Sequence, residues 1–451
     1  MTALATTREG NRYRAYGPRQ LPAIGQRYGL SAEVVESIDV IAHVLPFRVN
    51  DHVLDNLVDW NNIPDDPMFQ LLFPQAGMLA DNTTAQLRSL ARRGWPRAET
   101  QRLTTAIRRD LNPHPSGQME LNVPMEAGSN FAIPGLQHKY RETVLYFPAQ
   151  GQTCHAYCTY CFRWAQFVGD PELKFATADP SQLVRYLGEH PAVTDVLVTG
   201  GDPLIMSTAR LTAHVEPLLG VGSVRTVRFG TKTLTFWPGR YVDDQDSADL
   251  LGLFEKIVVS GRTCAVMAHF SHPREIDQPL TIEAIRRIRD TGAQVFCQAP
   301  LIARVNDDPA VWADLWRREA ALGAVPYYMF VERDTGPHDY FKVPLPRAVQ
   351  IFQDAYRQLP GLARTVRGPV MSATPGKIVV DGSYQSSSSQ RLYLRFLQAR
   401  DPGIVGQPFT ARCSPHASWF TELDSFEAPH RVLAALDSGD RRLPSTSRAG
   451  M

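Results

Sequence analysis

Apolar residues recur at helical spacing in the first third of the chain. The segment SAEVVESIDVIAHVLPF begins at Ser31, which is placed to cap the helix that this spacing predicts. The segments TTAQLRSLARRGWP and AETQRLTTAIRRDLNP each carry one apolar stripe among charged residues. The proline-punctuated segment WNNIPDDPMFQLLFPQ is expected to be a loop. The pattern predicts a mainly helical region over residues 18–136, preceded by a flexible N-terminus over residues 1–17.

From about residue 141, short apolar runs alternate with amphipathic helices. Asp179 and Pro180 are placed to start one helix, and Gly292 and Gly323 to end two others in a left-handed conformation. The apolar runs are TVLYFP, TDVLVTG, VRTVRFG, CAVMAHF, AQVFCQAP, PYYMFVE and RGPVM. Strand, helix and strand at this spacing predict an α/β fold with a parallel sheet, arranged as a partial (β/α)6 barrel similar to a TIM barrel.

The expected barrel occupies residues 137–380, with its functional residues in the loops that follow the strands. Residues 381–451 form a C-terminal extension. Its last residues, DRRLPSTSRAGM, are polar and small, and they are expected to be mobile.

The amino-acid composition limits the kinds of partner that the protein is expected to bind. The net charge of +1 indicates neither a nucleic-acid nor a membrane partner, and no apolar run approaches the length of a membrane span. The N-terminus has no apolar segment of the kind found in secretory signals. Three of the six cysteines are clustered, while Cys264, Cys297 and Cys413 stand alone. This usage is typical of a reduced, cytoplasmic protein whose clustered thiols bind a metal.

The segment GQTCHAYCTYCFRWAQ contains the clustered cysteines, Cys154, Cys158 and Cys161. Three thiolates on one loop can hold three corners of an iron–sulfur cube and leave the fourth iron open to a small molecule. A structural zinc site would need four ligands. The alternatives are a zinc knuckle, or three unrelated buried cysteines.

Cys-x3-Cys-x2-Cys with an aromatic residue before the last cysteine resembles the radical S-adenosylmethionine (SAM) superfamily. Over about residues 30–400 the chain resembles, more narrowly, the lysine 2,3-aminomutase family. The further segments that carry this resemblance are VLVTGGDPLI, VRFGTKTLTFWPGRY, HFSHPREI, RVNDD, PYYMF and NIPDDPMFQLLFPQ. The resemblance implies a [4Fe–4S] cluster on the three cysteines and a SAM molecule that is cleaved to a 5′-deoxyadenosyl radical.

Gly200 and Gly201 follow a predicted strand, where the absence of a side chain allows backbone to approach a ligand closely. The resemblance implies that this loop binds the amino group of SAM, with Asp202 beside it. It also implies that His269, His272 and Gln298 belong to the wall of the SAM site. The pair of histidines in HFSHP has no nearby carboxylate pair, so we assign it no metal.

Lys377 and Arg163 match two further family positions. The resemblance implies that Lys377 holds pyridoxal phosphate (PLP) and that Arg163 pairs with the α-carboxylate of the substrate. A lysine in that role needs a desolvated site, and a planar guanidinium suits a carboxylate. The family has a longer glycine run before this lysine, whereas this chain has only Pro375-Gly376.

Lysine-acting members of the family hold the distal ammonium group with two aspartates. A gap-free alignment of PYYMFVERDTG places Arg333 at the first of these positions, and Ser372 falls near the second. A cation in place of an anion favours an acidic substrate such as glutamate or aspartate. A shift of one residue would instead place Asp334 or Glu332 there and restore a cationic substrate.

We therefore expect a radical SAM, PLP-dependent amino acid 2,3-aminomutase that acts on a small-molecule amino acid. The resemblance implies an electron donor such as flavodoxin or ferredoxin, and a homo-oligomer. With Cys413 alone near the C-terminus, no structural zinc is expected. The alternatives are a lysine-type 2,3-aminomutase, a PLP-independent radical SAM enzyme of the same fold, and a non-enzymatic metal- or nucleotide-binding protein. Binding of PLP and reductive cleavage of SAM would distinguish them.

Overall fold

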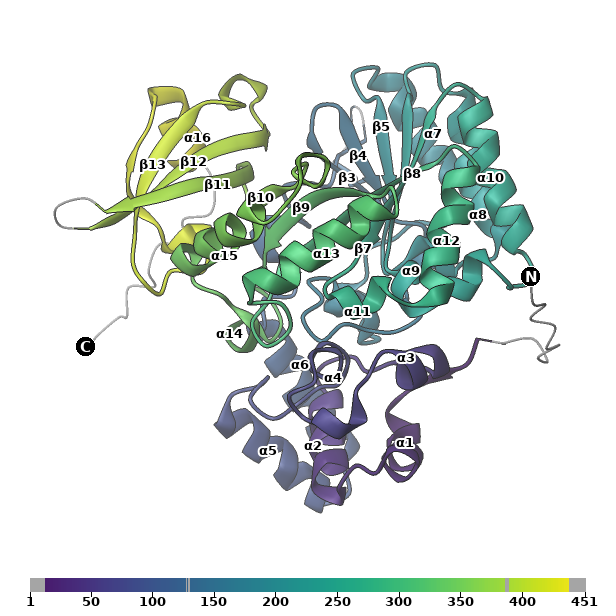
Figure 1. The fold of residues 1–451 in the computed structure, drawn as a ribbon, viewed down its shortest axis with the longest axis vertical. Coiled ribbons are helices and arrows are strands. Elements are labelled where there is room, and N and C mark those ends of the chain that lie inside the picture. The colour runs from purple at the N-terminus through teal and green to yellow at the C-terminus, as the bar shows by residue number, and fades with distance from the viewer. Residues whose placement is uncertain (1–12, 127, 129, 386–388, 438–451) are drawn as a thin grey trace.

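One twelve-stranded sheet organises the fold, and helices pack along it (Figure 1). The computed structural model describes residues 13–126, 128, 130–385 and 389–437. The strand order follows the chain, from β3 (Leu136–Tyr140) at one edge to β14 (Asp424–Glu427) at the other. Each new strand is therefore added beside the previous one, as expected for short connections between neighbouring elements.

Seven neighbouring strands run parallel, and they are the seven apolar runs of the sequence. They are β4 (Thr143–Tyr146), β5 (Asp195–Val198), β6 (Thr226–Thr231), β7 (Thr263–His269), β8 (Gln294–Leu301), β9 (Val325–Val331) and β10 (Arg367–Ser372). Burial alternates along β6, where Val227 and Phe229 are covered. Arg228 and Gly230 lie on the opposite, inner face. The predicted α/β class is confirmed.

Helices connect the parallel strands and cover the outer face of the sheet (Figure 1). The longer ones are α7 (Pro180–Glu189), α8 (Thr208–Val215), α10 (Ser247–Val259), α12 (Pro279–Asp290), α13 (Pro309–Ala321) and α15 (Leu345–Arg357), and the short ones are α9 (Thr233–Phe236), α11 (Pro273–Ile276) and α14 (His338–Phe341). Asp179 caps α7 by accepting from the N–H of Ser181. Gly292 and Gly323 follow α12 and α13 with φ values of +83° and +71°. These predicted helix ends are confirmed.

The sheet stays open, so the expected barrel is present only as a curved α/β sheet. The far edge of β10 is occupied by β11 (Gly376–Gln385), which pairs with it antiparallel. The remaining strands are β12 (Gln390–Ala399), β13 (Pro408–Cys413) and β14. The curvature nevertheless brings β3 into contact with β12, and the Lys139 ammonium donates to the carbonyl of Ala373. The inner face thus encloses a space without a closed ring of strands.

The antiparallel strands form the C-terminal lobe, with α16 (His430–Asp437) packed on them. This lobe has its own apolar core, which includes Phe396 and Trp419. The expected boundary at residue 380 falls within β11, so the sheet runs continuously from the parallel part into the lobe.

Helices make up most of the N-terminal region, which lies below the sheet in Figure 1. They are α1 (Leu21–Tyr28), α2 (Ala32–Ala42), α3 (Asp51–Asn56), α4 (Pro67–Leu72), α5 (Asp81–Arg92) and α6 (Arg97–Asp110). Ser31 caps α2 as predicted. The prediction of a loop for WNNIPDDPMFQLLFPQ is wrong in part, because α4 forms within it. Asp66 caps this helix and Pro67 fits its first position, where no N–H is needed.

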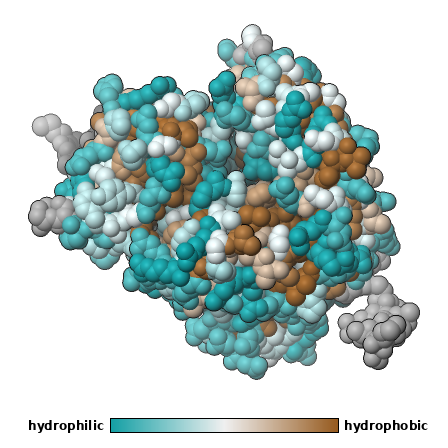
Figure 2. All heavy atoms as spheres, turned by 45° about the horizontal axis from the view of Figure 1, so that its top comes forward, coloured by the Kyte–Doolittle hydropathy of each residue, from teal (hydrophilic) through white to brown (hydrophobic). Residues whose placement is uncertain are grey.

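The predicted mobile ends lie largely outside the described residues, which exclude 1–12 and 438–451. Nearby, Ala15–Tyr16 forms β1, which pairs with β2 (Val49–Asn50). Hydrophilic side chains cover most of the face seen in Figure 2, with small hydrophobic groups between them. Among the described residues, no helix combines the length and the apolar character needed to cross a membrane.

Asp66 also joins the N-terminal region to the sheet. It is fully buried, and its Oδ2 lies 2.5 Å from Nη1 of Arg274 on α11. We expect Asp66→Asn, which keeps an oxygen for the cap but removes the charge, to lower the free energy of unfolding by about 1–3 kcal/mol. Urea titration at an unchanged slope measures this loss. Asp65→Asn, at an exposed neighbour, is the control. Equal midpoints for both variants would contradict a stabilising ion pair.

Candidate functional site

A cavity of about 640 Å³ lies inside the curved sheet. Its walls are the inward-facing residues of the parallel strands and the loops that follow them. Most residues singled out from the sequence line it, with His272 and Asp334 as exceptions: Cys154, Cys158, Cys161, Arg163, Gly200, Gly201, Asp202, His269, Gln298, Arg333, Ser372 and Lys377. The fold therefore brings together positions that are more than 200 residues apart in the sequence.

The loop that carries the cysteines, residues 153–162, owes its shape to hydrogen bonds with other parts of the chain. The N–H of Tyr157 donates to the carbonyl of Arg48 at 2.9 Å. The N–H of Thr159 donates to the carbonyl of Leu71 at 2.8 Å. Both acceptors belong to the N-terminal region, so that region determines how this cysteine loop is presented to the cavity.

Cys158 is buried and Cys154 and Cys161 are half-buried, and burial raises the pKa of each thiol, to about 12 for Cys158. They are therefore neutral unless a metal replaces their protons. Three thiols on one loop that faces a cavity match the donors of a [4Fe–4S] cluster with one open iron. Within the described residues, no three His, Cys, Asp or Glu side chains are gathered closely enough to hold a single metal ion.

Gly200 and Gly201 are required where their loop touches the cysteine loop. A Cβ on Gly201 would lie 2.5 Å from the carbonyl oxygen of Thr153, and Gly200 has a φ of +144°. The N–H of Asp202 donates to that same Thr153 carbonyl at 2.8 Å. The glycines thus permit backbone to approach backbone, in addition to the ligand approach that the sequence indicated.

The buried carboxylate of Asp202 connects the loop that follows β5 to the end of β6. It accepts from the hydroxyls of Thr231 and Thr233, at 2.8 and 3.0 Å. It also accepts from the N–H groups of Lys232 and Leu204, at 2.8 and 3.0 Å. Burial still raises the pKa of this carboxyl group. Since its oxygens are engaged within the protein, Asp202 acts on the site by holding the glycine loop in place.

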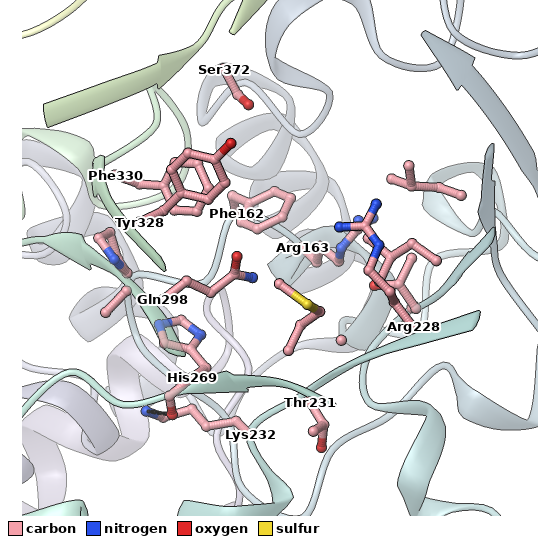
Figure 3. A pocket seen from close by; sticks show the side chains of 18 of the residues that line it. Phe162, Arg163, Arg228, Thr231, Lys232, His269, Gln298, Tyr328, Phe330 and Ser372 are labelled. Atoms are coloured by element: carbon pink, nitrogen blue, oxygen red, sulfur yellow. Dashed lines mark hydrogen bonds between the residues drawn. The ribbon is translucent and has the colours of Figure 1, made fainter. Parts of the chain in front are cut away.

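His269 and Gln298 are register partners on β7 and β8, and both reach into the cavity (Figure 3). Nε2 of His269 lies 3.1 Å from the hydroxyl of Tyr160 in the cysteine loop. Burial lowers the pKa of His269 well below its usual range, so the ring is neutral. His272 faces α11 instead, where its ring accepts from the N–H of Arg274 as a helix cap.

Arg163 is a half-buried cation between two aromatic rings. Its guanidinium carbon lies 4.6 Å from the centroid of Phe147 and 4.8 Å from that of Phe162. Burial lowers the pKa of Arg163 to about 10, and it remains charged at neutral pH. Among the described residues, no carboxylate is ion-paired with it. A half-buried cation that faces a cavity in this way attracts an anion.

Lys377 lies on β11 directly after the Pro375-Gly376 turn, opposite Ser372 on β10. Its Nζ faces aromatic rings of Tyr328 and Phe330, whose centroids are 4.5 and 5.8 Å away. The same rings stand with Phe162 on one side of the cavity in Figure 3. The shortened turn therefore still delivers the amine to the cavity.

The amine of Lys377 is held in a state suited to nucleophilic chemistry. Burial, together with the nearby Arg228 and Arg367 guanidinium groups, lowers the pKa of Lys377 to about 7. Asp195 opposes this shift but is already paired with Arg228. A substantial fraction of the amine is therefore neutral near pH 7, as a carbonyl-bearing cofactor requires.

Arg333 and Ser372 are brought together at one end of the cavity. Nη2 of Arg333 donates to the carbonyl of Ser372 at 2.9 Å, and its guanidinium lies 5.2 Å from the Phe162 centroid. Asp334 is absent from the cavity lining, and its carbonyl accepts from the Asn112 amide at 2.7 Å. Glu332 does line the cavity, but its Oε2 lies 2.5 Å from Nδ1 of His338.

Several cavity residues were not identified from the sequence. They are Lys139, Tyr140, Phe162, Asp195, Arg228, Lys232, Tyr328 and Phe330. Nε of Arg228 donates to Asp195 at 2.8 Å, and Lys232 is paired with the buried Glu275 at 2.6 Å. Asp195 and Arg228 sit within apolar runs, at alternate positions from the covered residues. A charged residue at such a position within an apolar run indicates that the inner face of the sheet is polar.

The contact between the glycine loop and the cysteine loop can be tested directly. Gly201→Ala forces a methyl group against the Thr153 backbone, and we expect it to cost about 1–3 kcal/mol and to lower iron content several-fold after anaerobic reconstitution. Gly188→Ala on α7 meets no atom within 4 Å and is the control. Iron per chain and urea midpoints are the measurements. Full iron content in Gly201→Ala would show that the close contact is not needed.

Comparisons with known proteins show which proteins this chain is similar to. No family model matches the sequence. A protein of Aquifex aeolicus provisionally named L-lysine 2,3-aminomutase is 27% identical over 394 residues, which cover 87% of this chain and 92% of the relative. L-lysine 2,3-aminomutases of Fusobacterium nucleatum and Clostridium subterminale are 25% and 26% identical, over 51% and 52% of this chain. The match spans about half of those two relatives, 51% and 53% of their lengths.

Among solved structures, the radical S-adenosylmethionine methyltransferase TsrM from Kitasatospora setae, with cobalamin and a [4Fe-4S] cluster bound, aligns with 48% of this chain and 42% of its own. The identity is 12% and the TM-score is 0.29, so nothing about this chain's fold or site follows from that alignment. The sequence relatives are the informative result, because the match to the Aquifex aeolicus protein covers 87% of this chain. The chain is thus homologous to proteins named L-lysine 2,3-aminomutase, the family that its motifs resemble.

Proposed function

We propose that this protein is a radical SAM, PLP-dependent 2,3-aminomutase that acts on an acidic amino acid such as glutamate or aspartate. One observation carries the proposal: three cysteine thiols, a half-buried cation at Arg163 and an amine with a lowered pKa at Lys377 line a single cavity. The homology to L-lysine 2,3-aminomutases supports the same reaction class. No other described cavity unites these groups.

The residues of the cavity divide into those that hold cofactors and those that hold substrate. Cys154, Cys158 and Cys161 would hold a [4Fe–4S] cluster, with SAM beside the glycine loop, and Lys377 would hold PLP. When bound, the cluster with SAM supplies a carbon-centred radical, and PLP supplies an imine through which an amino group can migrate. The protein's part is to orient these groups and to exclude water, and the enclosed inner face of the sheet does both.

Arg163 would bind the α-carboxylate of the substrate. Its guanidinium is stacked between the rings of Phe147 and Phe162, which orients its N–H groups without an internal carboxylate. A fixed planar fork binds a carboxylate through two parallel hydrogen bonds. Because the residue follows Cys161 by two positions, the substrate would be held close to the cysteine loop.

Arg333 supports the acidic side chain of the substrate. It, and not Asp334, lines the cavity, and its position is set by the Ser372 carbonyl. The carboxylates of Asp195 and Asp202 are engaged by protein donors, which leaves the Arg163 cation without an internal counterion among the described residues. With cations at both Arg163 and Arg333, a substrate that carries a distal carboxylate is therefore favoured over one that carries a distal ammonium group.

A lysine-type 2,3-aminomutase is the second candidate, because the carboxyl group of Glu332 also lines the cavity. We further propose that flavodoxin or ferredoxin supplies the electron and that the protein is a cytoplasmic homo-oligomer. The six cysteines, all free, suit a reducing compartment.

Lys377 is the residue on which PLP dependence is tested. We expect borohydride reduction of the anaerobically reconstituted protein with PLP to leave one pyridoxyl group on Lys377, located by mass spectrometry. The rate of labelling should rise through about pH 7, because burial lowers the amine pKa to about 7 and only the neutral amine reacts. Lys256→Arg, at an exposed lysine, should label fully, and Lys377→Arg should not. An iron-loaded protein without this adduct would indicate the PLP-independent alternative.

Arg333 is the residue on which substrate class is tested. We expect turnover of glutamate or aspartate but not of lysine, and a KM for the acidic substrate about 10–100-fold higher in Arg333→Gln, since a charge-assisted hydrogen bond is lost. Arg347→Gln, at an exposed position on α15, is the control. Turnover of lysine by the unmodified protein, with no turnover of either acid, would reassign it to the lysine type.

A further inference from the structure

Four side chains form a continuous hydrogen-bonded series from the cavity to the surface of the C-terminal lobe. Oε2 of Glu332, just after β9, lies 2.5 Å from Nδ1 of His338 on α14. Nε2 of His338 lies 3.3 Å from the hydroxyl of Ser418. That hydroxyl lies 3.2 Å from Oε1 of Glu422, in the short 3-10 helix η12 (Phe420–Glu422). Glu332 and His338 come from the connection between β9 and α14, and Ser418 and Glu422 come from the C-terminal lobe, so only the fold brings the two halves together.

The two ends of this series differ in their surroundings. Glu332 lines the cavity and is 3% exposed, whereas Glu422 is exposed to solvent. Ser418 between them is 1% exposed. The other carboxylate oxygen of Glu332, Oε1, is buried and has no hydrogen-bond partner among the described residues. A buried carboxyl with a free oxygen at a cavity wall is costly unless it is used by a ligand or held protonated.

The central pair is matched for proton exchange near neutral pH. Burial raises the pKa of Glu332 to about 7, against the opposing hydrogen bond from His338. For His338, burial is the largest influence and works against the charged ring, but the hydrogen bond to Glu332 and the charges of Glu332, Asp334 and Asp339 together outweigh it and raise the pKa. The other charged groups that act on this pair are Asp334, Asp339 and Lys342. Neither member of the pair is strongly fixed in one protonation state, so a proton can reside on either.

We propose that Glu332, His338, Ser418 and Glu422 form a proton relay that exchanges protons between the cavity and solvent. A proton enters at Glu422, which passes it to the hydroxyl oxygen of Ser418 as that hydroxyl donates its own proton to Nε2 of His338. Nδ1–H of His338 then transfers its proton to Oε2 of Glu332. One proton leaves the solvent, one arrives on the Glu332 carboxyl, and His338 ends neutral with its proton on Nε2. The reverse sequence exports a proton.

The relay gives the enclosed cavity a means to change its proton content. An amino acid enters as an ammonium ion, and its nitrogen must lose a proton before it can bond to carbon. This use of the relay rests on the proposed function, whereas the path itself rests only on the series of hydrogen bonds. An alternative, in which the four residues serve only to attach the C-terminal lobe to β9, is an outcome of the test below.

The test follows the Glu332 carboxyl by infrared spectroscopy, without turnover. A protonated carboxylic-acid band that titrates near pH 7 should be present in the full-length protein and absent from Glu332→Gln. After a rapid pH jump, this band should change at least about tenfold more slowly in Ser418→Ala than in the unmodified protein, a loss of about 1.4 kcal/mol in the barrier. Ser418→Thr restores a hydroxyl and should restore the rate. Ser223→Ala, at a half-buried serine outside the series whose hydroxyl oxygen is covered, is the control.

The expected result is a slow Ser418→Ala variant, a rescued Ser418→Thr variant and a similar slowing in Glu422→Gln, which alters only the exposed end. An unchanged rate in Ser418→Ala, with only a lower melting temperature, would overturn the relay and leave a structural attachment. Absence of the Glu332 band would also overturn it. Failure of the proposed function is distinguishable, because it would appear as absent turnover in a protein whose infrared response is intact.

Discussion

Main-chain hydrogen bonds between the cysteine loop and two distant segments are the constraint on which the site depends. The loop has little regular structure, so its amides must find partners elsewhere. Tyr157 and Thr159 donate to the N-terminal region, while the Thr153 carbonyl accepts from Asp202. The N-terminal helices are therefore part of the site's architecture, although the described lining of the cavity includes no residue of α1 to α6. The contact at Gly201 closes the other side of the loop.

Electrostatic pairing then decides which charges inside the cavity are available. Arg228 is neutralised by Asp195, and Lys232 by Glu275, each within a largely buried pair. Such pairs have to be complete, because a single buried charge is expensive. Arg163 is not neutralised in this way. The pattern of pairing, more than the number of charges, therefore decides where in the cavity an anion would be favoured.

The sequence predicted the parallel sheet and the residues that line its cavity better than it predicted how the sheet ends. The apolar runs and the helix ends at Asp179, Gly292 and Gly323 depend on local chemistry, which a single sequence carries. Helix α4 was missed because prolines dominated the pattern around the Asp66 cap. β10 pairs with β11, and this pairing leaves the sheet open. No local sequence pattern determines which strand edges pair when they are far apart in the chain. The lowered pKa of Lys377 likewise arises from Arg228 and Arg367, which only the fold brings near it.

The protonation state of the Lys377 amine depends on this electrostatic arrangement. Its folded pKa of about 7 lies far below its usual value, so the folded protein disfavours the charged form below about pH 10. An anionic ligand beside the amine would favour the charged form again, and binding near pH 7 would then take up a proton. Glu332 titrates in the same range and stands at the cavity wall, which is where a source of such protons would have to lie.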